Sequence, residues 1–284
     1  MTLTRDRFGM ECPVRRETGR RDRVTGAPCG AMIEQFVREG WVHVPGAFTT
    51  AAAARCRALL RAELLRTEGV DLDDPAGWTA PVLRVAGMGG AGFTASANTP
   101  ALHAAFDALV GPGRWRPRTG MGTFPVRFPV PGAPGDDGWH VESSFTGPDG
   151  GPRLSVDSRG RSLLMLFLYS DVGPDDAPTL LRSGSRRDVA PLLAPHGAAG
   201  ADWLPFCGEA VPATARRPEV AACGRAGDVY LVHPFVVHRA QAMSPAARRP
   251  RVIAQPPLEP ASEPAFDLPA GTAPAERVVR EALG

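Results

Sequence analysis

The second half of the chain consists of short β-prone runs separated by clusters of Gly, Pro and Asp. After Thr119 such runs cover, for example, residues 123–128, 162–170, 179–182, 228–232 and 251–255. Many short strands with turn residues between them are typical of sandwiches and barrels. We therefore expect a mainly β fold with flanking helices, a double-stranded β-helix of the jelly-roll, cupin-like type.

The N-terminal part has helical rather than strand character. Helical spacing begins near Met32 and stops at Gly40, where a glycine can end a helix. Thr49 or Thr50 can cap a second helix that extends to Leu65. A shorter helix is expected at 101–109, and the chain ends in a short amphipathic segment at 275–283. The helices thus flank the predicted strands, as the fold class requires.

Composition divides the chain into a domain and two terminal segments. Residues 1–30 are rich in Arg, Gly and Thr without periodicity, so we expect a disordered N-terminal extension. Residues 31–260 form the predicted jelly-roll domain, and 261–284, rich in Pro and Ala, form a C-terminal tail. Within the domain, frequent Gly, Ala and Pro over 71–100 indicate loops.

The charge, hydropathy and cysteine content exclude several classes of protein. All 32 basic residues are Arg, they are spread along the chain, and the net charge is only +2, so no nucleic-acid surface is expected. No apolar run approaches the ~20 residues of a membrane-spanning helix. The five cysteines are odd in number and widely spaced, which favours reduced thiols and a cytoplasmic location. Nothing in the sequence predicts an oligomeric state.

Two short motifs carry candidate chemistry. His140 and Glu142 are two residues apart, so on a strand both side chains would project from the same face. The run from Gly227 leads through a bend at His233 and Pro234 to a second histidine, His238. Two His and one carboxylate form the facial triad of non-haem iron(II) oxygenases, which leaves coordination positions open. We therefore predict that His140, Glu142 and His238 bind a metal and are catalytic.

Some polar residues near these motifs have a structural and a functional interpretation. His233 is a rival for the distal ligand but can simply end a strand before Pro234. Arg127 precedes the first motif and is either a surface residue or an arginine that pairs with a carboxylate in the pocket. Arg159 and Arg161 flank a glycine and indicate a solvated turn, with contact to an anionic substrate as the alternative.

From Met32 to Leu258 the chain resembles the phytanoyl-CoA dioxygenase family, in particular its bacterial members. The first element is a helix, a strand and then Pro45-Gly46, and the second is the Trp-His-x-carboxylate motif that ends at Glu142. In chain order the matching elements are 36–46, 138–142, 166–172 with 176–179 and 183–185, 227–238, and 249–252. Five elements in the right order are more specific than any one of them.

The resemblance implies an iron(II)- and 2-oxoglutarate-dependent dioxygenase that hydroxylates a small-molecule metabolite with dioxygen and releases succinate and carbon dioxide. Arg251 would pair with the far carboxylate of 2-oxoglutarate, because a guanidinium binds a carboxylate through two hydrogen bonds. Arg127 and Thr179 would also contact this cosubstrate. The alternation in residues 251–255 places Arg251 on the same face as Ile253, whereas Arg249 before Pro250 should face solvent.

The chain departs from the family pattern at several positions. Glu142 stands where the family usually has Asp, and Arg186 replaces the last residue of its Gly-Ser-His segment. Ala240 replaces a hydroxyl residue, and the segment after His238 is longer, which leaves Arg249 as a rival of Arg251. Two other functions stay open: a cupin-like divalent-metal hydrolase or isomerase, and a non-catalytic binding module of the same fold. The substrate and the outcome of the reaction are not encoded in these motifs.

Overall fold

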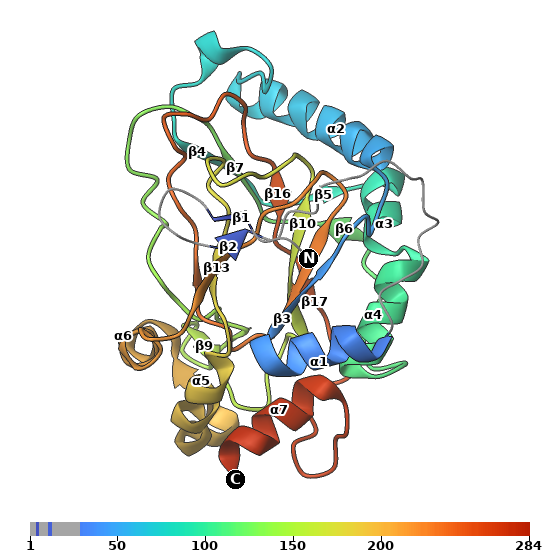
Figure 1. Ribbon diagram of the computed structural model, residues 1–284, viewed down its shortest axis with the longest axis vertical. Coiled ribbons are helices and arrows are strands. Elements are labelled where there is room, and N and C mark those ends of the chain that lie inside the picture. Colours follow the sequence, from blue (N-terminus) through green and yellow to red (C-terminus); the bar gives the residue numbers. More distant parts are fainter. Residues whose placement is uncertain (1–3, 6–10, 13–28) are drawn as a thin grey trace.

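Two facing β-sheets form the centre of the molecule (Figure 1). The structure, a computed structural model, describes residues 4–5, 11–12 and 29–284. The larger sheet has the strand order β16–β10–β14–β3, and β17 also pairs with β10. These strands are β3 (Trp41–Val44), β10 (Leu163–Leu168), β14 (Val229–Val232), β16 (Ile253–Ala254) and β17 (Pro257–Leu258).

The smaller sheet has the order β1–β2–β13–β11–β15. Its strands are β1 (Thr4–Arg5), β2 (Glu11–Cys12), β11 (Leu180–Arg182), β13 (Glu219–Ala221) and β15 (His238–Arg239). Isolated bridges extend both sheets: Arg127 of β7 (Phe124–Arg127) pairs with Arg251 beside β16, and His140 pairs with His238 of β15. Strand β4 (Val82–Val85) continues the larger sheet because it pairs with β7.

The strict alternation of side chains in β10 separates the core into two layers. Leu164, Leu166 and Leu168 pack in one apolar cluster with Leu181 of β11, which lies in the other sheet, so this cluster fills the space between the sheets. The intervening residues of β10 pack in the main core with buried residues of the helices. A strand buried on both faces accounts for the unbroken apolar run in this part of the sequence.

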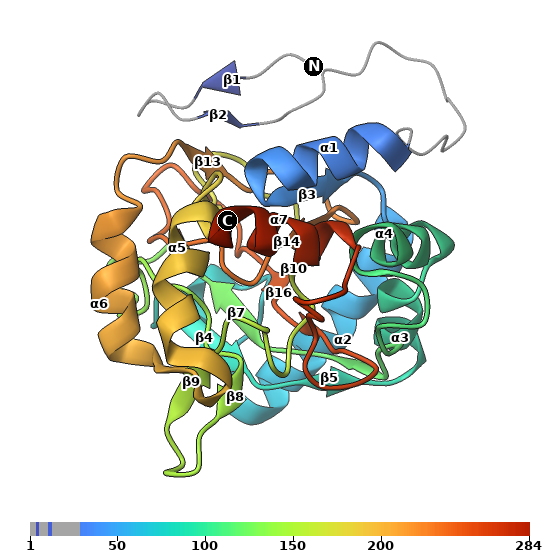
Figure 2. The ribbon, with the colours of Figure 1, turned by 90° about the horizontal axis from the view of Figure 1, so that it is seen from below.

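Helices cover the outer side of the larger sheet and one end of the molecule (Figures 1 and 2). The helices are α1 (Cys29–Glu39), α2 (Thr50–Glu68), α3 (Ala91–Ala97), α4 (Pro100–Val110), α5 (Arg186–Leu193), α6 (Trp203–Ala213) and α7 (Pro274–Leu283), with short 3₁₀ helices η1 (Pro75–Gly77) and η2 (Ala194–Ala199). Helix α7 packs against the core through Ala275, Val278 and Val279. The hairpin of β8 (Phe145–Thr146) and β9 (Pro152–Leu154) projects from the body in Figure 2.

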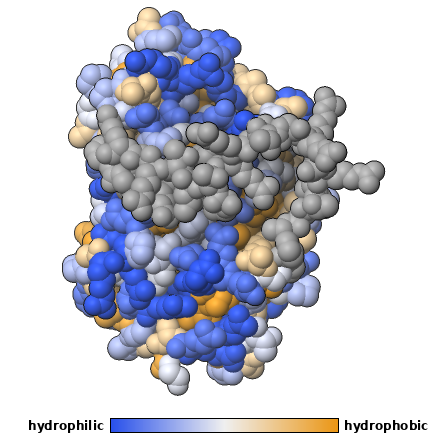
Figure 3. Space-filling view, in the orientation of Figure 1, coloured by the Kyte–Doolittle hydropathy of each residue, from blue (hydrophilic) through white to orange (hydrophobic). Residues whose placement is uncertain are grey.

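The remaining strands are β5 (Met88–Gly89), which pairs with β6 (Gly120–Met121), and β12 (Ala201–Asp202), which pairs with β9. The part of the surface that Figure 3 shows in colour is mostly hydrophilic with scattered apolar patches. Large apolar side chains that are exposed among the described residues are Leu59, Leu65, Leu204 and Leu283. Single exposed residues of this kind are normal for a folded domain.

The predicted helices at 32–40, 51–65 and 101–109 are confirmed, and the amphipathic segment 275–283 lies in α7. The N-cap of α2 is Thr49, whose side chain accepts a hydrogen bond from the Ala52 amide at 3.1 Å, and α1 ends before Gly40, which has φ +84°. Helices α3, α5 and α6 were not predicted, because Gly, Ala and Pro dilute the apolar period in these segments. The expected loop region 71–100 therefore contains α3 and the strands β4 and β5.

The expectation of a regular strand for His140 and Glu142 is wrong. His140 forms an isolated bridge, and residues 141–144 belong to no strand, although the Ser144 amide donates to the Arg153 carbonyl of β9 at 2.8 Å. A physical reason is that the Val141 carbonyl accepts a hydrogen bond from the Trp203 side chain at 2.6 Å instead of from a neighbouring strand. Likewise, only Ile253–Ala254 of the expected strand 251–255 pairs as β16.

Reduced thiols throughout were also predicted, and this is wrong for Cys223, which is disulfide-bonded. Cys56 and Cys207 are free and buried. Sequence spacing could not reveal the bond, because folding brings distant segments together. The predicted extension 1–30 lies largely outside the described residues. No helix in the described part of the chain has the length and apolar character needed to cross a membrane.

Candidate metal centre

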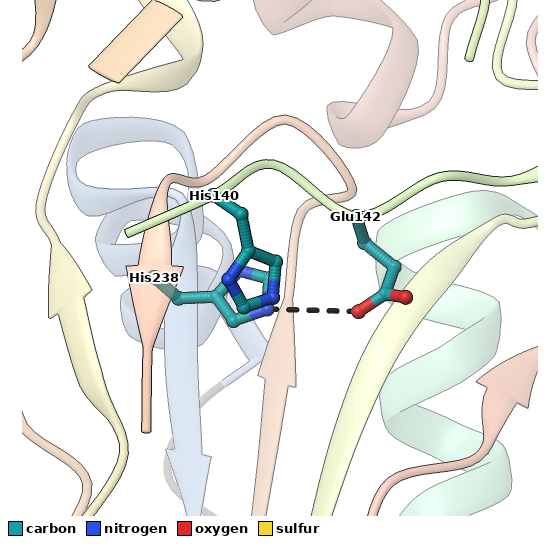
Figure 4. Close-up of side chains that lie close together, drawn as sticks. All are labelled: His140, Glu142 and His238. Carbon is teal, nitrogen blue, oxygen red and sulfur yellow. Dashed lines mark ion pairs between the residues drawn. The ribbon is translucent and has the colours of Figure 1, made fainter. Parts of the chain in front are cut away.

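His140, Glu142 and His238 converge at one point between the two sheets (Figure 4). One ligand atom of each side chain lies within 4.8 Å of the other two. The backbones of the two histidines are bridged: the His140 amide donates to the His238 carbonyl at 3.0 Å, and the His238 amide donates to the His140 carbonyl at 2.9 Å. The bridge thus brings together two segments that are far apart in sequence.

The register of the smaller sheet explains why these side chains face inward. His238 lies opposite Leu181, and Leu180 lies opposite Arg239. Directly opposed residues point to the same side of a sheet. Leu181 belongs to the cluster between the sheets, whereas Leu180 packs in a separate cluster on the outer side with Trp139. His238 therefore points into the molecule, and Arg239 points outward.

Both imidazole rings have a fixed tautomer. Nδ1 of His140 lies 2.9 Å from the Gly138 carbonyl, and Nδ1 of His238 lies 3.0 Å from the Val236 carbonyl. Because a carbonyl oxygen can only accept, each Nδ1 carries the proton and donates it. In the neutral ring the lone pair is then on Nε2, which is the atom that can bind a metal.

The charges in the centre favour the deprotonated forms that a metal needs. Burial, helped by the neighbouring His238 ring, lowers the pKa of His140 and keeps it neutral. Burial alone would raise the pKa of Glu142, but His238 and the positive charge of Arg161 outweigh it and hold the pKa at about 2. The Glu142 carboxylate lies 3.7 Å from Nε2 of His238. Two imidazole nitrogens and one carboxylate are a donor set that fits a divalent transition metal.

A cleft adjoins the centre and contains several other polar side chains. Glu142, His238, Arg161, Thr179 and Gln255 line it, together with the apolar residues Leu164, Met165, Leu166, Leu181 and Val232. Thr179 is 3% exposed, and its buried hydroxyl has no hydrogen-bond partner among the described residues. A buried hydroxyl without a partner is costly unless a ligand or water supplies one.

Arg251 and Arg127 are the other two residues predicted to contact the cosubstrate, and both are 1% exposed. The Arg251 guanidinium donates to the Ala177 carbonyl and, at 3.3 Å, to the Pro125 carbonyl. Burial, followed by the charge of Arg127, lowers the pKa of Arg251 to about 9. Arg127 donates to the Asp136 carboxylate at 2.5 Å, and its Nε and Nη1 atoms are buried without a partner.

Arg249 and His233, the rivals of Arg251 and His238, do not take part in the centre. Arg251 is buried, as the alternation argument predicted, and Arg249 is exposed, as its position before Pro250 predicted. His233 is fully buried away from the three converging side chains, with Nε2 3.1 Å from the Ala275 carbonyl. Its Nδ1 accepts the Phe235 amide at 3.1 Å, so both ring nitrogens serve the fold.

Several residues near the centre were missed or misplaced by the sequence interpretation. Trp203 of α6 is hydrogen-bonded to the Val141 carbonyl and meets the His140 ring edge-on at 6.2 Å, but nothing in the sequence links α6 to the motif. Arg161 lines the cleft and does not lie in a solvated turn, although Arg159 is exposed. Gln255 could have been found, because alternation puts it on the face of Ile253.

A second cavity, of about 450 Å³, lies near the surface. Ala240 and Ala177 line it along with Arg239, Asp137 and Asp175, and none of the three converging side chains takes part. Its lining includes Arg239, which points away from the interior, and Ala177, whose carbonyl accepts a hydrogen bond from the Arg251 guanidinium. None of the residues that line this cavity also lines the cleft beside the candidate centre.

Comparison with known proteins shows what fold the chain shares. No family model matches the chain, and no curated protein matches it in sequence. A protein of Salmonella typhimurium LT2, provisionally described as an oxidoreductase, is similar in structure with a TM-score of 0.56 and 13% identity over 83% of this chain and 71% of its own. The non-haem α-ketoglutarate-dependent carbocyclase SnoK from nogalamycin biosynthesis matches with a TM-score of 0.50 and 18% identity over 79% of this chain and 81% of its own. These likenesses show a common fold.

Proposed function

We propose that this chain is an iron(II)- and 2-oxoglutarate-dependent dioxygenase of the phytanoyl-CoA dioxygenase type, which hydroxylates a small-molecule metabolite. The observation that carries the proposal is the convergence of two imidazole Nε2 atoms and one carboxylate in the space between the two sheets. These side chains come from segments that are far apart in sequence. Two His and one carboxylate leave three positions free, which such an enzyme needs for cosubstrate and dioxygen. The fold shared with SnoK, a protein described as α-ketoglutarate-dependent, supports the same assignment.

The strand order supports a double-stranded β-helix. The larger sheet contains β7, β10, β14 and β16. The smaller sheet contains the His140 segment, which precedes β10, the strands β11 and β13, which follow β10, and β15, which follows β14. In this order the chain passes repeatedly between two sheets that share one interior, as a jelly roll requires. The His140 segment then lies beside β15, which carries His238, in the smaller sheet, and the two histidines can hold one ion.

Each role in the proposed reaction would fall to a described side chain. His140, Glu142 and His238 would hold the iron through Nε2, carboxylate and Nε2. Bound iron(II) would supply the redox chemistry that couples oxidative decarboxylation of 2-oxoglutarate, to succinate and carbon dioxide, with insertion of one oxygen atom into a C–H bond of the substrate. The chain itself would place the reactants and exclude water.

Arg251 would bind the far carboxylate of 2-oxoglutarate. Its guanidinium is buried on the interior face with only carbonyl partners, so the charge is not neutralised by an ion pair among the described residues. Thr179, whose hydroxyl lacks a partner, would donate to an oxygen of the same cosubstrate. Arg127, although paired with Asp136, would offer further N–H groups to this cosubstrate, since its Nε and Nη1 atoms have no hydrogen-bond partner among the described residues. The apolar walls of the cleft would keep water from the reacting atoms.

The test is anaerobic titration of the protein with iron(II) and 2-oxoglutarate. Chelation of iron by the keto acid should give a visible charge-transfer band, and admission of oxygen should yield succinate. A zinc hydrolase or isomerase of the same fold would show no such band. A protein that binds iron without a 2-oxoglutarate-dependent band would refute the proposed function.

A further inference from the structure

We propose that Arg161 binds an oxyanion of the substrate, a carboxylate or a phosphate, beside the metal centre. This inference rests on the proposed function and narrows the substrate to molecules with an anionic group on an otherwise apolar body. It starts from the position of Arg161, which lines the same cleft as Glu142 and His238. No other arginine lines that cleft in the part of the chain that the structure describes.

The hydrogen bonding of Arg161 leaves most of its guanidinium available. Its side chain makes one hydrogen bond within the described residues, from Nη2 to the Ser143 carbonyl at 3.0 Å. Ser143 directly follows Glu142, so this bond holds the guanidinium next to the ligand segment. The Nε atom is buried without a partner, and no described carboxylate lies within ion-pair distance of the guanidinium. A guanidinium held in place with free N–H groups is suited to bind a planar oxyanion.

Glu142 does not satisfy this charge. Burial lowers the pKa of Arg161, and the negative charge of Glu142 opposes that effect, so the two groups sense each other beyond ion-pair distance. Once Glu142 binds a metal, its charge is shared with the ion and becomes less available to Arg161. The buried cation would then lack compensation, which is unfavourable in a desolvated site.

Charge counting points to one further anion. Iron(II), Arg251 and Arg161 are positive, while Glu142 and the two carboxylates of 2-oxoglutarate are negative. Arg127 and Asp136 neutralise each other as a pair. With neutral histidines, the loaded centre keeps about one positive charge, and a substrate with one oxyanion would balance it. The apolar side chains of Leu164, Leu181 and Val232 line the rest of this narrow cleft, whose free volume is about 20 Å³.

The experiment uses small probes on the protein loaded with iron(II) and 2-oxoglutarate without oxygen. Benzoate and phenyl phosphate carry the two kinds of oxyanion on one apolar ring, and benzamide is the neutral match for benzoate. Binding next to the iron should shift the charge-transfer band without abolishing it. We expect wild-type protein to bind benzoate or phenyl phosphate more tightly than benzamide, and the stronger of the two identifies the kind of oxyanion.

The decisive variant is Arg161→Gln. It should weaken oxyanion binding roughly 10- to 100-fold, as expected for loss of a charge-assisted hydrogen bond, and leave benzamide binding unchanged. Arg161→Lys should restore part of the loss, and Arg159→Gln, at an exposed site in the same turn, should bind like wild type. In all variants the 2-oxoglutarate concentration for half-maximal band intensity should stay the same.

Three results would overturn the inference. The first is a wild-type protein that forms the band but does not prefer an oxyanion to benzamide. The second is unchanged oxyanion binding in Arg161→Gln. The third is a higher 2-oxoglutarate requirement in that variant, which would mean that Arg161 holds the cosubstrate. Absence of the band from wild-type protein would instead refute the proposed function, and the inference would fall with it.

Discussion

Arg127 and Arg251 lie directly opposite each other across an antiparallel bridge. The Arg127 amide donates to the Arg251 carbonyl at 3.1 Å, and the Arg251 amide donates to the Arg127 carbonyl at 2.9 Å. Opposed residues project to the same side, so two guanidinium groups are buried as neighbours, with Asp136 paired to Arg127. Arg251 is thus left without an ion pair among the described residues, in keeping with the proposal that it binds one carboxylate of 2-oxoglutarate.

A first prediction compares Arg251→Leu with Arg249→Leu. Loss of the buried guanidinium should raise the 2-oxoglutarate concentration for half-maximal uncoupled succinate formation roughly 10- to 100-fold, because the far carboxylate would be buried without its partner. Arg249 is exposed, so its replacement should have no effect beyond about twofold. A large effect of Arg249→Leu with none of Arg251→Leu would show that the longer segment after His238 shifts the cosubstrate site to the other arginine.

A second prediction concerns the three converging side chains. His140→Ala, Glu142→Ala and His238→Ala should each abolish the charge-transfer band and succinate formation, since each removes one of three donors. The melting temperature of the metal-free protein should change little, because the apolar cluster between the sheets stays intact. His196→Ala, at an exposed position, is the matched control. Full activity of His238→Ala, or a metal-free variant that no longer folds, would contradict the prediction.

The architecture was predictable because its signals are local. The apolar run of β10, the Thr49 cap and the alternation of Arg251 with Ile253 each follow from side-chain periodicity or from one hydrogen bond. The same alternation predicted a buried Arg251, and the position of Arg249 before Pro250 predicted that it is exposed. Where Gly and Pro dilute the pattern, as in α3 and α6, periodicity gave no helix.

The surroundings of the centre were not predictable because they depend on contacts between distant segments. Trp203 contacts the Val141 carbonyl from α6, and its position in sequence says nothing of this. Arg161 seemed solvated because Gly160 precedes it, yet the fold turns its side chain into the cleft. Asp136 lies in a Pro- and Gly-rich segment without periodicity, and only the structure pairs it with Arg127.

A third prediction concerns Trp203, which acts on the centre through the backbone. Its Nε1 atom donates to the Val141 carbonyl at 2.6 Å, between the two ligand residues His140 and Glu142. Trp203→Phe keeps an aromatic ring but removes this bond, so the ligand segment should be held less firmly. Iron affinity should fall roughly 10-fold, as is typical when groups that orient ligands are lost. Iron titration of the apoprotein, followed by the charge-transfer band, measures this.

Trp78→Phe is the control for that measurement. Trp78 also donates its Nε1 proton to a backbone carbonyl, that of Asp71 at 2.8 Å, but in another part of the molecule. Both variants should lose a similar amount of stability, and only Trp203→Phe should bind iron more weakly. Equal iron affinity in the two variants would show that the Trp203 hydrogen bond does not position the ligands.

The last prediction is a pH dependence of stability that originates at His233. The ring is fully buried, Nε2 donates to the Ala275 carbonyl, and Nδ1 accepts the Phe235 amide, so a second proton on Nδ1 would have no acceptor. Burial, with a contribution from the charge of Arg186, lowers the pKa of His233 to about 3. In the unfolded chain the pKa is about 6.5. Between these values the unfolded state binds the proton and the folded state does not, so stability from this group is complete above pH 6.5 and falls as the pH decreases toward 3.

The measurement is urea unfolding of metal-free protein at several pH values, with His233→Gln as the variant. Glutamine can donate and accept as the neutral ring does but cannot be protonated. The free energy of unfolding of wild-type protein should therefore lose roughly 2–3 kcal/mol more than that of His233→Gln between pH 7.5 and 4.5, at about 1.4 kcal/mol per pH unit. His196→Gln, which changes an exposed histidine, should follow wild type. Parallel pH profiles of wild type and His233→Gln would mean that His233 is protonated in the folded protein, against the hydrogen-bond pattern described above.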